Sequence, residues 1–215
     1  MKSGYALSMQ DLATLSALTF GAQAFVTLFV ILDPPGAAPI FLGLAAGKTV
    51  KEQRKLAWQA AFVSLFVIVT FALFGNALLD YLNISLAALQ GAGGILLLIT
   101  GLGLLTGSLV ESESATSQNI ALVPLGTPLL AGPGAIVTTM LYVQKADNGG
   151  QLTSLALAII AVHIIIGITF MFSTKILSVI KDSGVTLLAR IAGLLLSAIA
   201  VEMIVSAIKS FFSIS

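Results

Sequence analysis

An apolar run near the start of the chain is interrupted at residues 33–39, which read Asp-Pro-Pro-Gly-Ala-Ala-Pro. Proline lacks a backbone donor and clashes with the preceding helical turn, glycine adds flexibility, and aspartate adds charge. A helix inside a bilayer tolerates such a break only where protein or a water-filled cavity satisfies the freed backbone groups. A similar break recurs at residues 131–135, Ala-Gly-Pro-Gly-Ala. We expect the two breaks to form one site, approached from opposite sides of a membrane.

The composition indicates an integral membrane protein. The chain of 215 residues is 58% hydrophobic and only 9% charged, with a mean hydropathy of +1.07, whereas soluble domains are about 25% charged. A net charge of +1 gives no reason to expect nucleic acid binding. The absence of cysteine excludes thiol catalysis, disulfides and thiolate metal sites. With one histidine and few acids, we expect no metal site, no cofactor and no enzymatic activity.

Six apolar stretches are long enough to cross a bilayer, which takes roughly 20 residues. They are residues 12–32, 56–79, 84–105, 120–143, 152–172 and 186–208. A shorter apolar piece, residues 36–46, follows the first break, and a continuous helix over residues 12–46 would measure about 52 Å. Either the first span starts later than Leu12 or residues 36–46 fold back as a re-entrant piece. The sequence leaves both open.

The sequence therefore predicts an all-α, polytopic membrane protein, with residues 1–215 forming one transmembrane domain. Pro35 and Pro133 are 98 residues apart (133 − 35), and the segments that begin at Gln90 and Arg190 resemble each other at an offset of 100 (190 − 90). We interpret residues 12–106 and 119–210 as two repeats of three helices, each with a broken first helix. An odd number of spans forces the second repeat to be inverted, an arrangement typical of secondary transporters.

Positive charge predicts the orientation. The loops after the first, third and fifth spans hold six basic residues: Lys48, Lys51, Arg54, Lys55, Lys175 and Lys181. The opposite side holds three, which are Lys2, Lys145 and Lys209. We expect both termini to lie outside the cell, and we expect no cleaved leader.

The breaks supply the candidate substrate site, because helix N-termini attract carboxylates. The expected substrate-binding residues are Asp33, Pro35, Gly36, Ala37, Gln90, Gly132, Pro133, Gly134, Ala135, Thr138 and Thr139. Simpler interpretations stand beside this one. Asp33 followed by proline is a good helix N-cap, the threonines commonly bond to their own helix, and Gln90 suits an interhelical hydrogen bond.

Three further ionisable residues lie in predicted spans. Glu202 and His163 join Asp33 as candidates for proton coupling. The third residue, Arg190, is a candidate charge partner, and we expect Asp33 to be the acid that it pairs with. Each of the three has a structural alternative. Arg190 is placed so that its side chain can extend its charge to the interface. Glu202 can bond water near the outer surface. His163 can pack as a neutral side chain that bonds a carbonyl group.

The breaks resemble those of the MarC/SnatA family of bacterial and archaeal membrane proteins. The resemblance lies in residues 33–42, 128–136 (Pro-Leu-Leu-Ala-Gly-Pro-Gly-Ala-Ile), 93–97 and 190–194, and it extends to length and six-span layout. It implies an inner-membrane transporter, since members named for small neutral amino acid transport are proton-coupled carriers of glycine and alanine. The family's first break usually begins with Asn-Pro, and here Asp33 stands in the asparagine position.

We therefore expect a secondary active transporter of small neutral amino acids (glycine or alanine), coupled to protons and working by alternating access. The small side chains beside the breaks leave little room for a bulky substrate. The expected partners are this substrate, protons and the lipid bilayer, and a homo-oligomer is left open. The alternatives are an exporter of another small solute, or a channel. The direction of transport is not readable from the sequence.

Overall fold

The structure is a computed structural model that describes residues 9–45, 47–107 and 131–212. Over these residues all regular structure is helical. The helices are α1 (Met9–Leu32), α2 (Pro34–Leu44), α3 (Val50–Leu82), α4 (Leu86–Thr106), α6 (Pro133–Lys145), α7 (Gly149–Met171) and α8 (Ser173–Phe212).

Five stretches within these helices are long and apolar enough to cross a membrane. They are Ser16–Leu42, Val50–Leu82, Leu86–Thr106, Gly149–Met171 and Thr186–Phe212. The remaining predicted span, residues 120–143, lies partly outside the described residues, and its described part, residues 131–143, falls largely in the 13-residue α6. Large apolar side chains on the outside of these helices, such as Phe62, Phe66 and Leu73 on α3, are more than 60% exposed, as expected for a surface that contacts lipid.

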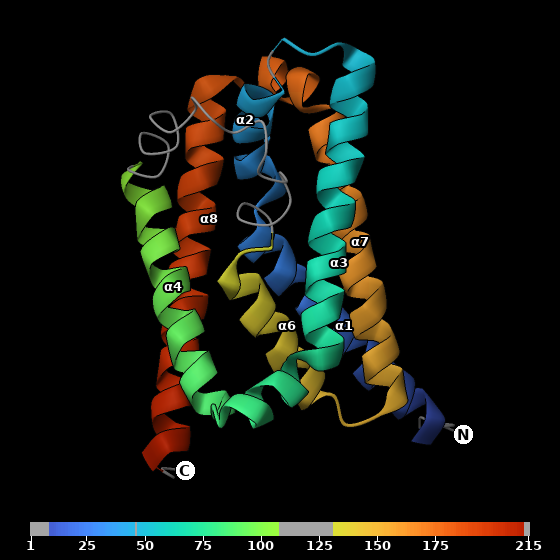
Figure 1. The fold of residues 1–215 in the computed structure, drawn as a ribbon, viewed down its shortest axis with the longest axis vertical. Helices are drawn as coiled ribbons and strands as arrows, with labels where there is room; N and C mark the ends of the chain where they lie inside the picture. Colours follow the sequence, from blue (N-terminus) through green and yellow to red (C-terminus); the bar gives the residue numbers. More distant parts are fainter. Residues whose placement is uncertain (1–8, 46, 108–130, 213–215) are drawn as a thin grey trace, which may run out of the picture.

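The first break does not reverse the chain. The backbone N–H of Asp33 donates to the Phe29 carbonyl (3.0 Å), and the Asp33 carbonyl accepts from the N–H of Ala37 (2.9 Å). These i to i−4 bonds carry the helical path across the junction, so α2 continues in the direction of α1 (Figure 1). Of the two arrangements that the sequence left open, the structure has the continuous one.

Two segments that the sequence analysis placed in loops are helical. Lys51, Arg54 and Lys55 lie in the first turns of α3, which begins with a capping box between Thr49 and Glu52. Lys175 likewise lies in the first turn of α8. Only Phe172 separates α7 from α8, so no loop exists there to hold it. Charge alone suggested loops here, but lysine and arginine are good helix formers, and neither segment contains proline.

Helix directions are visible in Figure 1 from the colour order along the chain. Helices α1, α2, α4 and α7 run toward one end of the bundle, and α3, α6 and α8 run toward the other, where both marked termini lie. Helix α2 packs on α7 and α8, while α6 packs on α3 and α4. Helix α7 also packs on α1 and α3, and α4 packs along α8.

Glycine allows α4 and α8 to approach closely. A Cβ added to Gly101 would lie 2.8 Å from the Gly193 carbonyl oxygen, and one added to Gly193 would lie 2.7 Å from the Gly101 carbonyl oxygen. Gly94 similarly meets the Ala200 carbonyl at 3.0 Å. Small residues at such contacts let helix backbones approach in a bilayer, where lipid provides no hydrophobic drive to associate.

We predict that Gly101→Ala destabilises the bundle by about 1–3 kcal/mol, the usual cost of overpacking. The added methyl group meets backbone atoms of α8, which cannot move aside as a flexible side chain can. Gly149→Ala is the matched control, because nothing lies within 4 Å of its added Cβ. Thermal unfolding in detergent should show a lower Tm for the first variant only. Equal Tm values would contradict the close α4–α8 contact.

Candidate functional site

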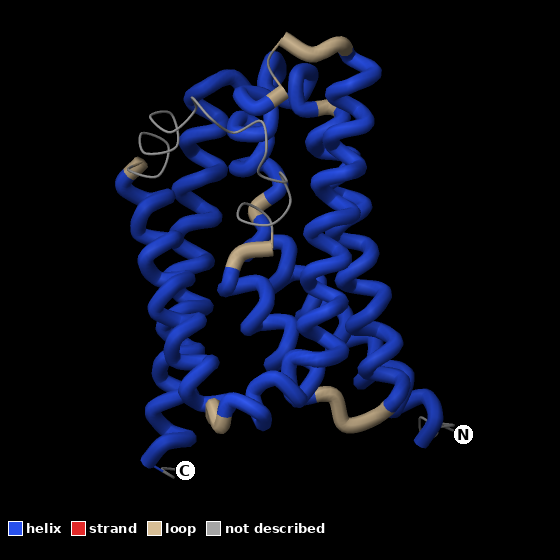
Figure 2. Tube along the Cα trace, in the orientation of Figure 1, coloured by secondary structure: helices blue, strands red, loops and turns tan. Residues whose placement is uncertain are grey.

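The two helix breaks lie near mid-height of the bundle. Figure 2 shows the interruption between α1 and α2 and the start of α6 at this level. Residues from both breaks belong to one buried apolar cluster: Leu32 and Ala37 from the first, and Ala131 and Ala135 from the second. Both breaks thus contribute residues to the same cluster, while the expectation that they form one site stays a prediction.

Asp33 caps the start of α2. It is partly buried, and its carboxylate Oδ1 accepts a hydrogen bond from the N–H of Gly36 at 3.2 Å. Its backbone is in the left-handed region, with φ of 38°, which Asp and Asn tolerate better than most residues. The carboxylate occupies the space that a Cβ on Gly36 would need. The N-cap interpretation from the sequence therefore describes its bonding here.

The prolines leave acceptors without helical donors. Pro34 and Pro35 have no N–H, so the carbonyl groups of Val30 and Ile31 cannot receive their i+4 bonds. Meanwhile the N–H groups of Gly36 and Ala37 are both bonded to Asp33. The first break is therefore rich in acceptors: one carboxylate and two freed carbonyls, with the first amides of α2 already engaged.

The second break has the opposite character. Gly132 is the N-cap of α6 and has no side chain to cap it. Its carbonyl accepts from Ala135 (3.0 Å) and Ile136 (3.2 Å), while Pro133 carries no N–H. The Gly134 N–H has no acceptor among the residues that the structure describes. Within the described part of the chain, the start of α6 thus presents one amide without an acceptor, together with the partial positive charge of a helix N-terminus.

The remaining predicted lining residues point into packing. Thr139 is fully buried and donates to the Ala135 carbonyl at 2.8 Å, the self-bonding expected of a helical threonine. The buried Thr138 hydroxyl lies 4.0 Å from the sulfur of Met203 on α8. Gln90 is partly exposed on α4, about 10 Å along that helix from Leu97, the residue that packs against Gly134.

The predicted charge pair is not formed. Arg190 and Glu202 are both exposed on α8, and among the described residues no hydrogen bond joins either to Asp33, whose carboxylate bonds Gly36 instead. The expectation of an Arg190–Asp33 pair was wrong because it considered only that both charges needed partners. It did not include the direction in which α8 presents Arg190.

His163 has a buried partner that the sequence analysis missed. Its Nε2 lies 3.0 Å from Ser64 Oγ on α3, and its Nδ1 lies 2.7 Å from the Ile159 carbonyl oxygen. Since a carbonyl only accepts, Nδ1 carries the proton and Nε2 accepts from the Ser64 hydroxyl. Both side chains are nearly inaccessible, at 0% and 3% exposed. Ser64 and His163 are 99 residues apart (163 − 64), the offset that could have suggested the pair.

Comparison with known proteins identifies the family. The model of the MarC family integral membrane proteins matches residues 18–212. The chain belongs to the MarC family. A UPF0056 membrane protein of Methanocaldococcus jannaschii is 39% identical over 199 residues, covering 89% of this chain and 97% of the relative. The membrane protein YvbG of Bacillus subtilis is 32% identical, covering 91% and 97%.

The family extends to Gram-negative bacteria. The membrane protein YhcE of Escherichia coli is 31% identical over 197 residues, covering 87% of this chain and 91% of the relative. No solved structure matches this chain. The protein is therefore an integral membrane protein of the MarC family (UPF0056).

We predict that the Asp33 cap and its left-handed backbone can be separated by three substitutions. Asp33→Asn keeps both the cap and the tolerance for positive φ, Asp33→Gly keeps only the tolerance, and Asp33→Ala keeps neither. Stability should fall in that order, with the alanine variant at least about 1 kcal/mol below the parent. Thermal unfolding in detergent measures it. An alanine variant as stable as the asparagine variant would rule out a structural role for the cap.

We also predict that Ser64 and His163 are energetically coupled. Ser64→Ala leaves Nε2 without a donor, and His163→Leu leaves the hydroxyl without an acceptor. Each should destabilise the protein, and the double variant by less than the sum, with a coupling of about 0.6–1.7 kcal/mol. Unfolding in detergent gives the cycle. Ser178→Ala is the control, because the Ser178 hydroxyl is exposed and bonds within its own helix. Strict additivity would show that the two side chains do not support each other.

Proposed function

We propose that this protein is a secondary active transporter of small neutral amino acids, glycine or alanine, that works by alternating access and is coupled to protons. The observation that carries the proposal is the contrast between the two breaks within one buried cluster. One helix start is capped by a carboxylate, and the other has, among the described residues, no side-chain cap and one amide without an acceptor. A zwitterion needs both kinds of partner.

The contrast orients the substrate. The ammonium group is placed at Asp33 and the freed carbonyls of Val30 and Ile31, which only accept hydrogen bonds. The substrate carboxylate is placed at the Gly134 N–H and the positive end of α6. The starts of the two half-helices therefore have different roles, because Asp33 already occupies the amides of Gly36 and Ala37. A small substrate fits, since alanine and glycine predominate around both breaks.

The helix directions support an inverted repeat. Helix α2 runs opposite to α6, α3 opposite to α7, and α4 opposite to α8 (Figure 1). The helix contacts are related in the same way. Helix α2 packs on α7 and α8, and α6 packs on α3 and α4, which are the counterparts of α7 and α8 in the other half. Two inverted halves that meet at broken helices provide the two outward-facing and inward-facing states of a carrier.

Asp33 is the proton carrier in this proposal. It is the acid at the breaks, whereas Glu202 is exposed on α8 and both nitrogens of His163 are bonded within the bundle. A carboxylate beside the ammonium group of the substrate couples proton binding directly to substrate binding. The protein then lies in the cytoplasmic (inner) membrane with both termini outside, since the bundle end that holds Lys51, Arg54 and Lys55 is opposite the termini.

The test is uptake of labelled glycine and alanine into proteoliposomes, with and without a proton gradient. A carrier shows saturable uptake that a gradient accelerates, and unlabelled substrate on the far side drives exchange. A channel shows neither saturation nor exchange. Absence of both glycine and alanine flux from well-folded protein would overturn the proposed substrate class.

We predict that Asp33→Asn lowers gradient-driven uptake at least about tenfold, the loss given by roughly 1.4 kcal/mol, while the protein stays folded. The physical reason is that asparagine keeps the cap but cannot exchange a proton. Exchange without a gradient should be less affected. The same measurement on Glu202→Gln is the comparison, and a loss of gradient dependence there but not in the Asp33 variant would assign the proton to Glu202.

A further inference from the structure

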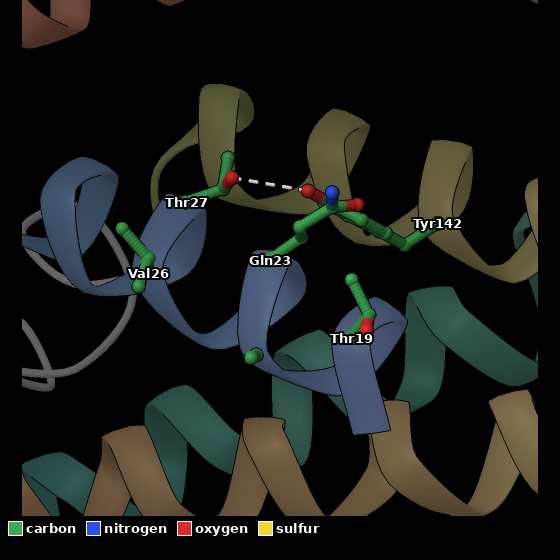
Figure 3. A pocket seen from close by; sticks show the side chains of 6 residues that line it. Thr19, Gln23, Val26, Thr27 and Tyr142 are labelled. Atoms are coloured by element: carbon green, nitrogen blue, oxygen red, sulfur yellow. Dashed lines mark hydrogen bonds between the residues drawn. The ribbon is translucent and has the colours of Figure 1, made fainter. Parts of the chain in front are cut away.

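A groove lies between α1 and the last turns of α6. It is wide and shallow, with a volume of about 520 Å³. Figure 3 shows the side chains that line it, which are Thr19, Ala22, Gln23, Val26, Thr27 and Tyr142. It lies in the half of the candidate span Ser16–Leu42 that is nearer the termini.

The α1 side of the groove carries a polar stripe. Thr19, Gln23 and Thr27 follow one another at intervals of four residues, so they lie along one face of the helix. Gln23 is exposed, and its amide offers both donors and acceptors, as hydroxyl groups do. Exposing such groups to hydrocarbon is costly. Among the described residues, no charged side chain lines the groove, so its chemistry suits a neutral or zwitterionic polar solute.

A hydrogen bond crosses the inner end of the groove. The Thr27 hydroxyl on α1 lies 3.0 Å from the Tyr142 hydroxyl on α6. The Tyr142 ring is held edge-on against Phe20, with ring centroids 5.5 Å apart. Thr27 precedes Asp33 by six residues, or about 9 Å along the helix. The bond therefore joins the two broken helices between the groove and the break site.

We propose that this groove is the route by which a small zwitterionic solute passes between the break site and the membrane side that holds both termini, and that the Thr27–Tyr142 hydrogen bond closes it. The proposal rests on the transport function proposed above and adds the pathway residues. Gln23 and the hydroxyl groups replace water around the moving solute. Separation of α1 from α6 at this point breaks one neutral hydrogen bond and the edge-on contact between Tyr142 and Phe20, and both are weak enough for a gate that opens and closes repeatedly.

Cysteine accessibility tests the route, and the chain contains no native cysteine. Gln23→Cys is treated in proteoliposomes with a membrane-impermeant, cationic methanethiosulfonate added on the side of the termini. Phe74→Cys is the matched control. It lies about 12 Å from the end of α3, as Gln23 lies about 10 Å from the start of its span, and Phe74 is 65% exposed away from the groove.

The expected result is labelling of Gln23→Cys at least about tenfold faster than of Phe74→Cys, slowed by added alanine. Lipid excludes a cationic reagent, whereas a water-filled route admits it. Equally slow labelling of both variants would mean that lipid or a second copy of the chain covers the groove, and it would overturn the proposal. Fast labelling from the opposite side alone would also overturn it.

The gate has its own test. Val30 lies one turn beyond Thr27 and packs in the interior. Tyr142→Phe removes the hydroxyl and keeps the ring contact with Phe20, so Val30→Cys should label about fivefold faster in that background, the factor expected for one neutral hydrogen bond. Labelling of Phe74→Cys should not change. An unchanged rate at Val30→Cys would show that this bond does not close the route.

Transport measured on the same vesicles separates the two proposals. If the parent protein moves alanine and Gln23→Cys does not label, the groove is not the route and the proposed function stands. If Gln23→Cys labels but neither glycine nor alanine moves, the proposed function fails, and the substrate route falls with it although the groove is wet.

Discussion

The structure depends on the hydrogen bonds that Asp33 makes across the first break. Two consecutive prolines remove two donors from the middle of an apolar helix, where no water is available to replace them. Asp33 continues the hydrogen bonding across the break, through its own N–H to Phe29, its carbonyl to Ala37 and its carboxylate to Gly36, while the Val30 and Ile31 carbonyls keep no helical donor. Because these bonds continue the helical path, α1 and α2 form one candidate span, and the interruption between them lies near mid-height of the bundle (Figure 2).

The second break solves the same problem without an acid, and this makes the halves chemically unequal. Gly132 offers only its carbonyl to the first turn of α6, and the Gly134 N–H has no acceptor within the part of the chain that the structure describes. An acceptor-rich break and a donor-bearing break contribute residues to one buried apolar cluster. That inequality supports a zwitterionic ligand more strongly than two identical helix starts would, because two positive helix ends would favour an anion.

Small residues determine how closely these parts approach. Gly134 allows α6 to start directly against Leu97 of α4, and Gly101 and Gly193 allow α4 and α8 to meet backbone to backbone. On the other side of the bundle, Gly167 accommodates the ring of Trp58. In a bilayer, close packing of this kind replaces the hydrophobic effect as the source of helix association. The glycines therefore determine which helices pack together and where.

Much of the fold could be predicted from local signals. Apolar length indicated the spans, and Asp-Pro-Pro-Gly and Gly-Pro-Gly indicated both breaks, while the motifs indicated the MarC family. Helix boundaries were less predictable near Lys51 and Lys175, since charge at the end of a span fits either a loop or the first turn of a helix. Whether residues 36–46 continue or fold back depended on the hydrogen bonds around Asp33, which composition does not specify.

The sequence by itself determined what is local: an all-helical chain of a membrane protein, broken where proline and glycine forbid a regular helix, with one acid at the first break. Only the tertiary structure decided which side chains meet. It paired His163 with Ser64, left Arg190 apart from Asp33, and brought Tyr142 to Thr27. The physical reason is that such contacts depend on how helices far apart in sequence rotate and cross, and apolar surfaces facing lipid on all sides carry little periodic signal of that rotation.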